Sequence, residues 1–287
     1  MGDLINGIFL GGVYTTVALG LTLVFGVMRL VNLAHGELLV GGGFLAYSVT
    51  SWLGIDPLIA LLLVVPAVMA ISYPLQRFVL NPLMPHGMEA PLVATFGLSV
   101  VAQMVFTLVY TSDAKSLNAP YGESSVAIAG EQVRSVFVIA LVAAVLMVVG
   151  LHLALTRLRI GRALRAAAER PAVAATMGID VAHVYALTFA LAAGLSAVGG
   201  VIIGVAFSLT PTTGISWLLR GFTVIVLGGM GSVWGTLAGG ILLGITQQLG
   251  ASAFGPQYTD LVVFSLLVSV LVLRPRGLLG KQLPAAG

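Results

Sequence analysis

Long apolar stretches fill most of this chain, and short charged or Pro/Gly-rich segments separate them. Nine stretches have the character of membrane-spanning segments, which need about 20 apolar residues to cross a hydrocarbon core of about 30 Å. They lie near residues 4–28, 36–53, 57–80, 91–111, 134–156, 183–207, 217–230, 233–250 and 258–273. Because lipid offers no partner for free N–H and C=O groups, we expect each stretch to be helical, or buried against protein where it is broken. The first 28 residues and the short stretch 217–230 could instead be re-entrant, which leaves eight crossings as the alternative.

The composition indicates the same class of protein. Of 287 residues, 59% are hydrophobic and only 8% are charged, whereas about a quarter of an average globular chain is charged. This excludes a water-soluble enzyme and a nucleic-acid-binding protein. We predict an all-α integral membrane protein, a polytopic bundle of eight or nine transmembrane helices with broken helices, in one domain over residues 1–287. Cys is absent, so the chain has no disulfide, thiolate metal site or Cys nucleophile.

The basic residues predict the orientation of the chain in the membrane. Eight of the thirteen Lys and Arg residues lie in two segments: Arg157, Arg159, Arg162, Arg165 and Arg170 within 157–182, and Arg274, Arg276 and Lys281 near the C-terminus. Basic segments favour the cytoplasmic side, so we expect both segments and the C-terminus in the cytoplasm. The loop 112–134 is more acidic and is expected outside. Nine crossings then put the N-terminus outside as well.

A polar segment interrupts the apolar pattern early in the chain. It carries Arg29, Asn32, His35 and Glu37 between two apolar stretches, where ionisable groups are costly. We expect a helix break around 32–36, with Gly36 supplying non-helical backbone and Glu37 in the first turn of the next helix, where the helix dipole favours an anion. His35 and Glu37 are two positions apart and should face different sides. Three roles stay open: a polar cytoplasmic turn, a lining or gate of a translocation path, and a proton relay or metal site.

The most distinct segment outside the apolar stretches is 157–182. Its Ala-rich composition predicts two short helices, the second beginning at Pro171 and ending at Gly178. Arg162, Arg165 and Glu169 fall at i, i+3 and i+7 and form one polar stripe. Ordinary connections between helices run about 2–8 residues, so a long structured one favours a docking partner. The alternative is an idle basic loop.

Two Gly-rich segments do not fit nucleotide-binding motifs. The segment that starts at Gly228 has the wrong glycine spacing for a dinucleotide loop and lies between apolar stretches. The segment 277–282 lacks both the spacing of a phosphate-binding loop and the Ser or Thr that follows its Lys. We therefore expect no cofactor in this chain, and if ATP drives transport, another polypeptide hydrolyses it.

Several motifs, in order along almost the whole chain, carry a family resemblance. They are Gly20-Leu-Thr-Leu-Val-Phe-Gly followed by Val31-Asn-Leu-Ala-His-Gly-Glu, Gly161-Arg-Ala-Leu-Arg-Ala with Glu169 and Gly178-Ile, Ala186-Leu-Thr-Phe, Val226-Leu-Gly-Gly-Met-Gly-Ser, and Arg274-Pro-Arg-Gly-Leu-Leu-Gly. With these residues the chain resembles the permease of branched-chain amino acid ABC importers, in particular the shorter, H-type membrane subunit.

The resemblance implies a non-enzymatic permease in a bacterial or archaeal cell (inner) membrane. It implies a homologous second permease, two cytoplasmic ATPases that bind ATP and Mg, and an extracytoplasmic substrate-binding protein. It also implies that 157–180 fits a groove of an ATPase, with Gly161, Arg162, Arg165, Glu169 and Gly178 as coupling residues. Asn32, His35 and Glu37 are the candidates for the translocation path or gate; no catalytic or metal-binding residue is expected.

Some positions depart from the family pattern. The family commonly has Phe at Leu33, Arg-Pro at Asn81-Pro82, and Thr or Ser at Arg276. These departures weaken the prediction of branched-chain amino acids as substrate, because near relatives carry urea, short amides or aromatic acids. A self-sufficient ion-coupled secondary transporter or channel that uses Asn32, His35 and Glu37 is the alternative function. An intramembrane hydrolase is disfavoured, because no suitable pair of polar residues is evident.

Overall fold

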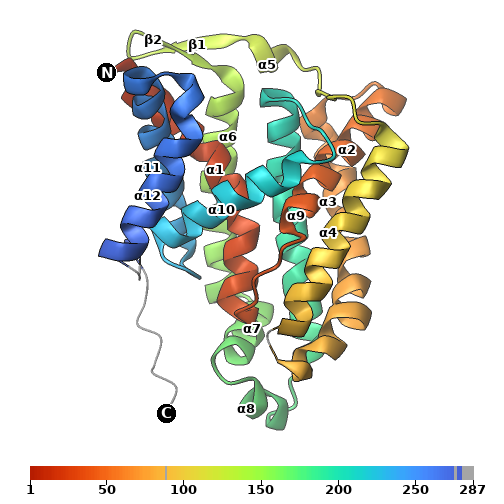
Figure 1. The fold of residues 1–287 in the computed structure, drawn as a ribbon. Coiled ribbons are helices and arrows are strands. Elements are labelled where there is room, and N and C mark those ends of the chain that lie inside the picture. Colours follow the sequence, from red (N-terminus) through yellow and green to blue (C-terminus); the bar gives the residue numbers. More distant parts are fainter. Residues whose placement is uncertain (88, 275–276, 280–287) are drawn as a thin grey trace.

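The protein is a bundle of membrane-length helices in a computed structural model that describes residues 1–87, 89–274 and 277–279 (Figure 1). The elements are α1 Gly2–Met28, α2 His35–Leu53, α3 Pro57–Pro74, the π-helix η1 Leu75–Leu80, the 3-10 helix η2 Asn81–His86, α4 Glu89–Tyr110, α5 Pro120–Glu123, β1 Ser125–Ile128, β2 Glu131–Arg134, α6 Ser135–Arg157, α7 Arg159–Glu169, α8 Pro171–Thr176, α9 Val181–Ala206, α10 Thr213–Gly228, α11 Val233–Phe254, the 3-10 helix η3 Pro256–Tyr258 and α12 Thr259–Leu273. All nine apolar stretches predicted above are helical.

Seven helical segments in the described part of the chain are long and apolar enough to cross a membrane. α2, with 19 residues, and α10, with 16 residues, are not among the seven. α1 is one continuous helix of 27 residues, so the first 28 residues do not form a re-entrant segment. At about 1.5 Å per residue, α10 is only about 24 Å long, and it runs obliquely across the bundle (Figure 1).

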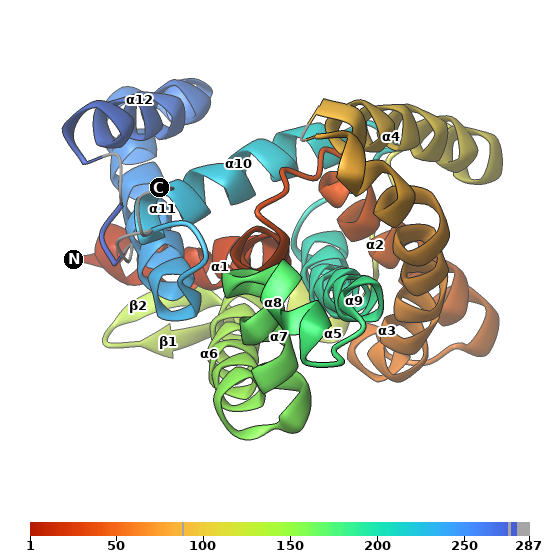
Figure 2. The same cartoon turned by 90° about the horizontal axis from the view of Figure 1, so that it is seen from below.

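Two helices, α1 and α9, form the centre of the bundle. In each, 83% of the most apolar window is buried within the protein. α1 packs against α11, α9 and α6, and α9 packs against α2 and α3 (Figure 2). The contact between α1 and α11 is close because Gly7 and Gly11 face the backbone of α11 near Gly240 and Gly244. Small residues at such contacts let two membrane helices approach.

The two ends of the bundle carry different elements. The hairpin β1–β2, in which Ser125 pairs with Arg134, lies at one end together with α5 and the N-terminus, and α7 and α8 lie at the other end (Figure 1). The basic segment 157–182 and the more acidic loop 112–134 are therefore at opposite ends, and the N-terminus shares the end of that loop, as the charge pattern predicts. Arg276 and Lys281, also expected on the basic side, lie outside the described residues.

Candidate functional site at the helix break

The predicted break lies between α1 and α2, but it is shifted toward the N-terminus. α1 ends at Met28, Arg29 takes a left-handed conformation with φ 52°, and α2 begins at His35. Within this link, the Asn32 side-chain oxygen accepts a hydrogen bond from the Ala34 N–H at 3.0 Å, and this turn leads the chain into α2. Asn32 is fully buried, and its Nδ2 has no partner among the described residues.

His35 points into the centre of the bundle. Its Nε2 lies 3.1 Å from the Ser196 hydroxyl of α9 and 3.4 Å from the Val17 carbonyl oxygen of α1. The imidazole is buried, and its Nδ1 has no partner in the part of the chain that the structure describes. His35 therefore connects the start of α2 to both central helices.

Glu37 points to the other side, as its spacing from His35 predicts. Its Oε1 accepts hydrogen bonds from Ser99 Oγ at 3.0 Å and Gln103 Nε2 at 2.9 Å, both on α4. Among the residues that the structure describes, its Oε2 has no partner and no ion pair includes Glu37. The residue lies in the first turn of α2, where the helix dipole favours an anion.

Gly36 has a different role from the predicted one, because it lies inside regular helix rather than in the break. A Cβ atom at Gly36 would come within 2.1 Å of the Gly214 carbonyl oxygen, so the backbones of α2 and α10 touch here. A Cβ at Gly214 would in turn come within 2.7 Å of the Glu37 carboxylate oxygens. The pair of glycines thus places the Glu37 carboxylate against the first turn of α10.

The residues of α4 that bond Glu37 and Leu33 form a polar stripe, which was not predicted from the sequence. Thr95, Ser99 and Gln103 follow one another at four-residue spacing, and Thr95 Oγ1 accepts the Leu33 N–H at 3.3 Å. Polar residues at this spacing share one face of a helix. Their presence within the apolar stretch 91–111 is the sequence signal that could have identified this stripe.

A second polar contact, also missed in the sequence, connects α10 to α12. Arg220 lies in the stretch 217–230 and donates to the Asp260 carboxylate at 2.7 Å. Its guanidinium also lies 5.2 Å from the centre of the Trp217 ring, a cation–π distance. An Arg within an apolar helix is a signal in itself.

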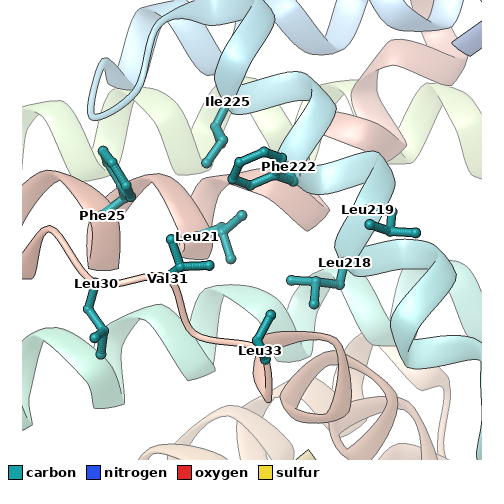
Figure 3. Close-up of a pocket in the computed structure, with 9 residues that line it drawn as sticks. All are labelled: Leu21, Phe25, Leu30, Val31, Leu33, Leu218, Leu219, Phe222 and Ile225. Atoms are coloured by element: carbon teal, nitrogen blue, oxygen red, sulfur yellow. The ribbon is translucent and has the colours of Figure 1, made fainter. Parts of the chain in front are cut away.

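A cavity of about 210 Å³ lies between α1, the break and α10 (Figure 3). Its walls are formed entirely by apolar side chains: Leu21, Phe25, Leu30, Val31, Leu33, Leu218, Leu219, Phe222 and Ile225. The link that contains Asn32 therefore runs along one wall of an apolar space.

The segment 157–182 forms two short helices, as predicted. Arg162, Arg165 and Glu169 are all exposed along α7. Gly161, in the first turn of α7, is buried, and a Cβ there would come within 2.2 Å of the Ala154 carbonyl oxygen of α6. The polar stripe is thus presented outward by a helix that is packed closely onto α6.

The end of α8 follows the predicted termination at Gly178. Gly178 has a φ of 83°, its N–H donates to the Ala175 carbonyl at 3.0 Å, and the Ile179 N–H donates to the Ala174 carbonyl at 3.1 Å. This is the Schellman pattern of helix termination. The stripe residues and Gly178 therefore lie on separate parts of the α7–α8 pair.

An ion pair fixes the chain where it enters α9. Arg77 of η1 binds both carboxylate oxygens of Asp180 at 3.0 Å. These bonds, with a further one from the His183 N–H, lower the pKa of Asp180 to about 2. Asn81, which departs from the family pattern, donates to the Ala182 carbonyl oxygen at 2.7 Å in the same region.

Comparison with known proteins agrees with this architecture. A family model described as branched-chain amino acid transport system / permease component matches residues 4–271. The high-affinity branched-chain amino acid transport system permease protein BraD of Pseudomonas aeruginosa is 34% identical over 97% of this chain and 95% of its own length. LivH of Escherichia coli, which has the same description, is 31% identical over 97% of this chain and 95% of its own length.

No solved structure matches the chain. Within the described ranges, His, Cys, Asp and Glu residues form no group of three that could hold a metal ion. The relatives are named as transport permeases. Because the family model spans nearly the whole sequence and the fold is a bundle of membrane-length helices, the chain belongs to the family of branched-chain amino acid transport permeases.

Proposed function

We propose that the chain is the permease subunit of an ATP-driven importer in the cell (inner) membrane. It forms half of the translocation path together with a homologous second permease, and separate cytoplasmic ATPases with bound ATP and Mg drive it. An extracytoplasmic binding protein delivers the substrate. The names of BraD and LivH support branched-chain amino acids as the substrate class.

The observation that carries this proposal is the geometry of α7. Its exposed stripe of Arg162, Arg165 and Glu169 stands at one end of the bundle, and none of the ion pairs among the described residues includes these side chains. The close contact of Gly161 with α6 holds the helix in place. A charged, rigidly mounted surface at the basic end suits a cytoplasmic protein partner.

A physical route leads from this surface to the helix break. α7 packs against α6, α1 and α9. α1 ends at the break, and α9 holds His35 through Ser196. Closure of the ATPases against α7 would therefore bias the arrangement of α1 and α9, which lead into the break and hold His35. Asn32, His35 and Glu37 serve as path lining or gate.

The test replaces Arg162, Arg165 and Glu169 together by Ala. We expect the variant to insert into the membrane normally, but to lose co-purification with the ATPase subunits and to lose transport-coupled ATP hydrolysis, because the charged docking contacts are gone. A matched control replaces Asp113, Lys115 and Glu123, three charged residues at the hairpin end, by Ala and should keep the ATPases bound. Full coupling in the α7 variant would refute docking through this stripe.

One observation favours the ion-coupled alternative: the buried Glu37 carboxylate has an oxygen without a partner among the described residues. Reconstitution of the chain without ATPase subunits separates the two functions. Uptake driven by a proton or sodium gradient and abolished by Glu37→Gln would support the secondary transporter. If the chain is an importer subunit, the chain alone should show no uptake driven by an ion gradient.

A further inference from the structure

The cavity beside the break lies where three irregular features of the bundle meet. It is bounded by the last turns of α1, by the non-helical link before α2, and by the oblique helix α10 (Figure 3). Non-helical backbone at membrane depth is tolerated where it is buried in protein or lines a cavity. Interrupted helices are also where transporters commonly place substrate sites, because the last turn of such a helix leaves carbonyl groups without helical partners.

The size of the cavity restricts what it can hold. Its volume is about 210 Å³, and apolar cavities of about 150 Å³ already accept a six-carbon ring such as benzene. A branched aliphatic group of three or four carbons therefore fits with room to move, as an intermediate in transport requires.

The walls restrict the chemistry of the occupant. All nine lining side chains are aliphatic or aromatic, so a polar solute inside would lose its hydrogen bonds to water without replacement. Urea and short amides are disfavoured for that reason. The polar segment is nevertheless close, because Asn32 stands between the lining residues Val31 and Leu33 and its Nδ2 has no partner in the described part of the chain.

We propose that this cavity is the subsite that receives the branched aliphatic side chain of the amino acid during translocation. The proposal rests on the transport function proposed above and assigns the apolar part of the substrate to named residues. The ammonium and carboxylate groups of the substrate remain beside the break, outside the apolar space. Leu33, from the link, and Leu219, from α10, both line the cavity (Figure 3) and determine how large a side chain enters.

The first test narrows the cavity with Leu219→Trp. Its control is Ile215→Trp, one turn away on α10 and outside the cavity lining. The two positions are matched in exposure, because Leu219 is 45% and Ile215 is 48% exposed. ATP-driven uptake of leucine and of alanine is measured in vesicles that contain the complete transporter and its binding protein. We expect the leucine-to-alanine ratio to fall about tenfold in Leu219→Trp, because one methylene in an apolar pocket changes discrimination by about 10- to 200-fold. The ratio should stay unchanged in Ile215→Trp.

The second test does not depend on how a bulky residue packs. Because the chain has no Cys, Leu33→Cys and Leu219→Cys each create a single thiol on this chain, and its labelling by a small maleimide is followed on this subunit within the complete transporter. Leucine should slow labelling of both thiols during turnover, and urea at the same concentration should not. Thiols that react only in the isolated chain would show that the second permease fills the cavity. Labelling that changes with lipid composition and not with leucine would show an acyl chain there, and either result overturns the proposal.

The results that would refute the subsite differ from those that would refute the importer function. Absence of ATP-driven leucine uptake by the unmodified complex would refute the proposed function itself. Uptake that proceeds normally, with equal leucine-to-alanine ratios in both Trp variants and no protection of either thiol, would refute only the subsite.

Discussion

The two glycines that bring α2 against α10 make the tightest contact at the helix break. In Gly36→Ala, the added methyl group would overlap the Gly214 carbonyl oxygen at 2.1 Å, and backbone cannot yield as a flexible side chain can. We expect the variant to lose about 1–3 kcal/mol of stability through overpacking. Thermal unfolding of the purified protein in detergent measures this loss.

The control for that substitution is Gly97→Ala in α4. A Cβ at Gly97 meets nothing within 4 Å, so the change should be neutral or stabilise the helix by up to about 1 kcal/mol. Equal unfolding temperatures for the two variants would contradict the proposed role of Gly36.

At the residue scale, the polar residues of the break can be predicted from the sequence, but their hydrogen-bond partners cannot. Asn32, His35 and Glu37 are evident because polar and ionisable groups are costly between two apolar stretches. Ser196 and Ser99, which bind His35 and Glu37, are small residues that any apolar helix tolerates. Which helix lies beside which depends on the folded bundle, and periodicity within one helix does not specify it.

At the scale of elements, the polar stripe is what connects α4 to the break. Only 11% of the most apolar window of α4 is buried, yet Ser99 and Gln103 both donate to Glu37. In the double variant Ser99→Ala with Gln103→Leu, the carboxyl group keeps its burial and loses its donors. We expect a loss of about 1–3 kcal/mol, measured by thermal unfolding.

Adding Glu37→Met to that double variant should restore most of the stability, since removal of both sides of a buried polar contact is nearly neutral. Thr107→Val is the control on α4, because the Thr107 hydroxyl donates to the Gln103 carbonyl of its own helix. A triple variant less stable than the double variant would show that Glu37 contributes through contacts other than those with α4.

The sequence predicts the elements well where their patterns are strong. The nine apolar stretches and the two helices of 157–182 follow from hydropathy, from Pro171 and from Gly178. The oblique course of α10 is not predictable in this way, because it depends on contact with Gly36 of α2 and on the ion pair of Arg220 with Asp260 of α12. The short hairpin β1–β2 was also missed, since strands of four residues carry little periodicity.

At the scale of the whole molecule, the separation of charged ends predicts the orientation in the membrane. Ala127 in the hairpin and Ala175 in α8 are both exposed and lie at opposite ends. We expect Ala127→Cys to react with a membrane-impermeant maleimide in intact cells, and Ala175→Cys to react only in inside-out vesicles, because basic segments stay in the cytoplasm.

The chain has no native Cys, so label on the purified chain reports only the introduced position. Labelling of both positions from the same side would contradict the arrangement of the ends. Labelling of Ala175→Cys in intact cells and of Ala127→Cys only in inside-out vesicles would agree with the fold but show the opposite orientation in the membrane.

The central position of α1 has a consequence for biosynthesis. α1 leaves the ribosome before α11, against which it packs most extensively. α11 begins roughly 200 residues later, which takes about 10–40 s at ordinary rates of translation. During that interval the helix resides in lipid without this neighbour. The hydroxyl groups of Thr15 and Thr22 donate to carbonyl oxygens within α1 itself, so they need no partner from another helix before α11 is synthesised. When α11 arrives, Thr22 gains Thr236 at 2.6 Å, and the nascent chain exchanges lipid contacts for its permanent ones.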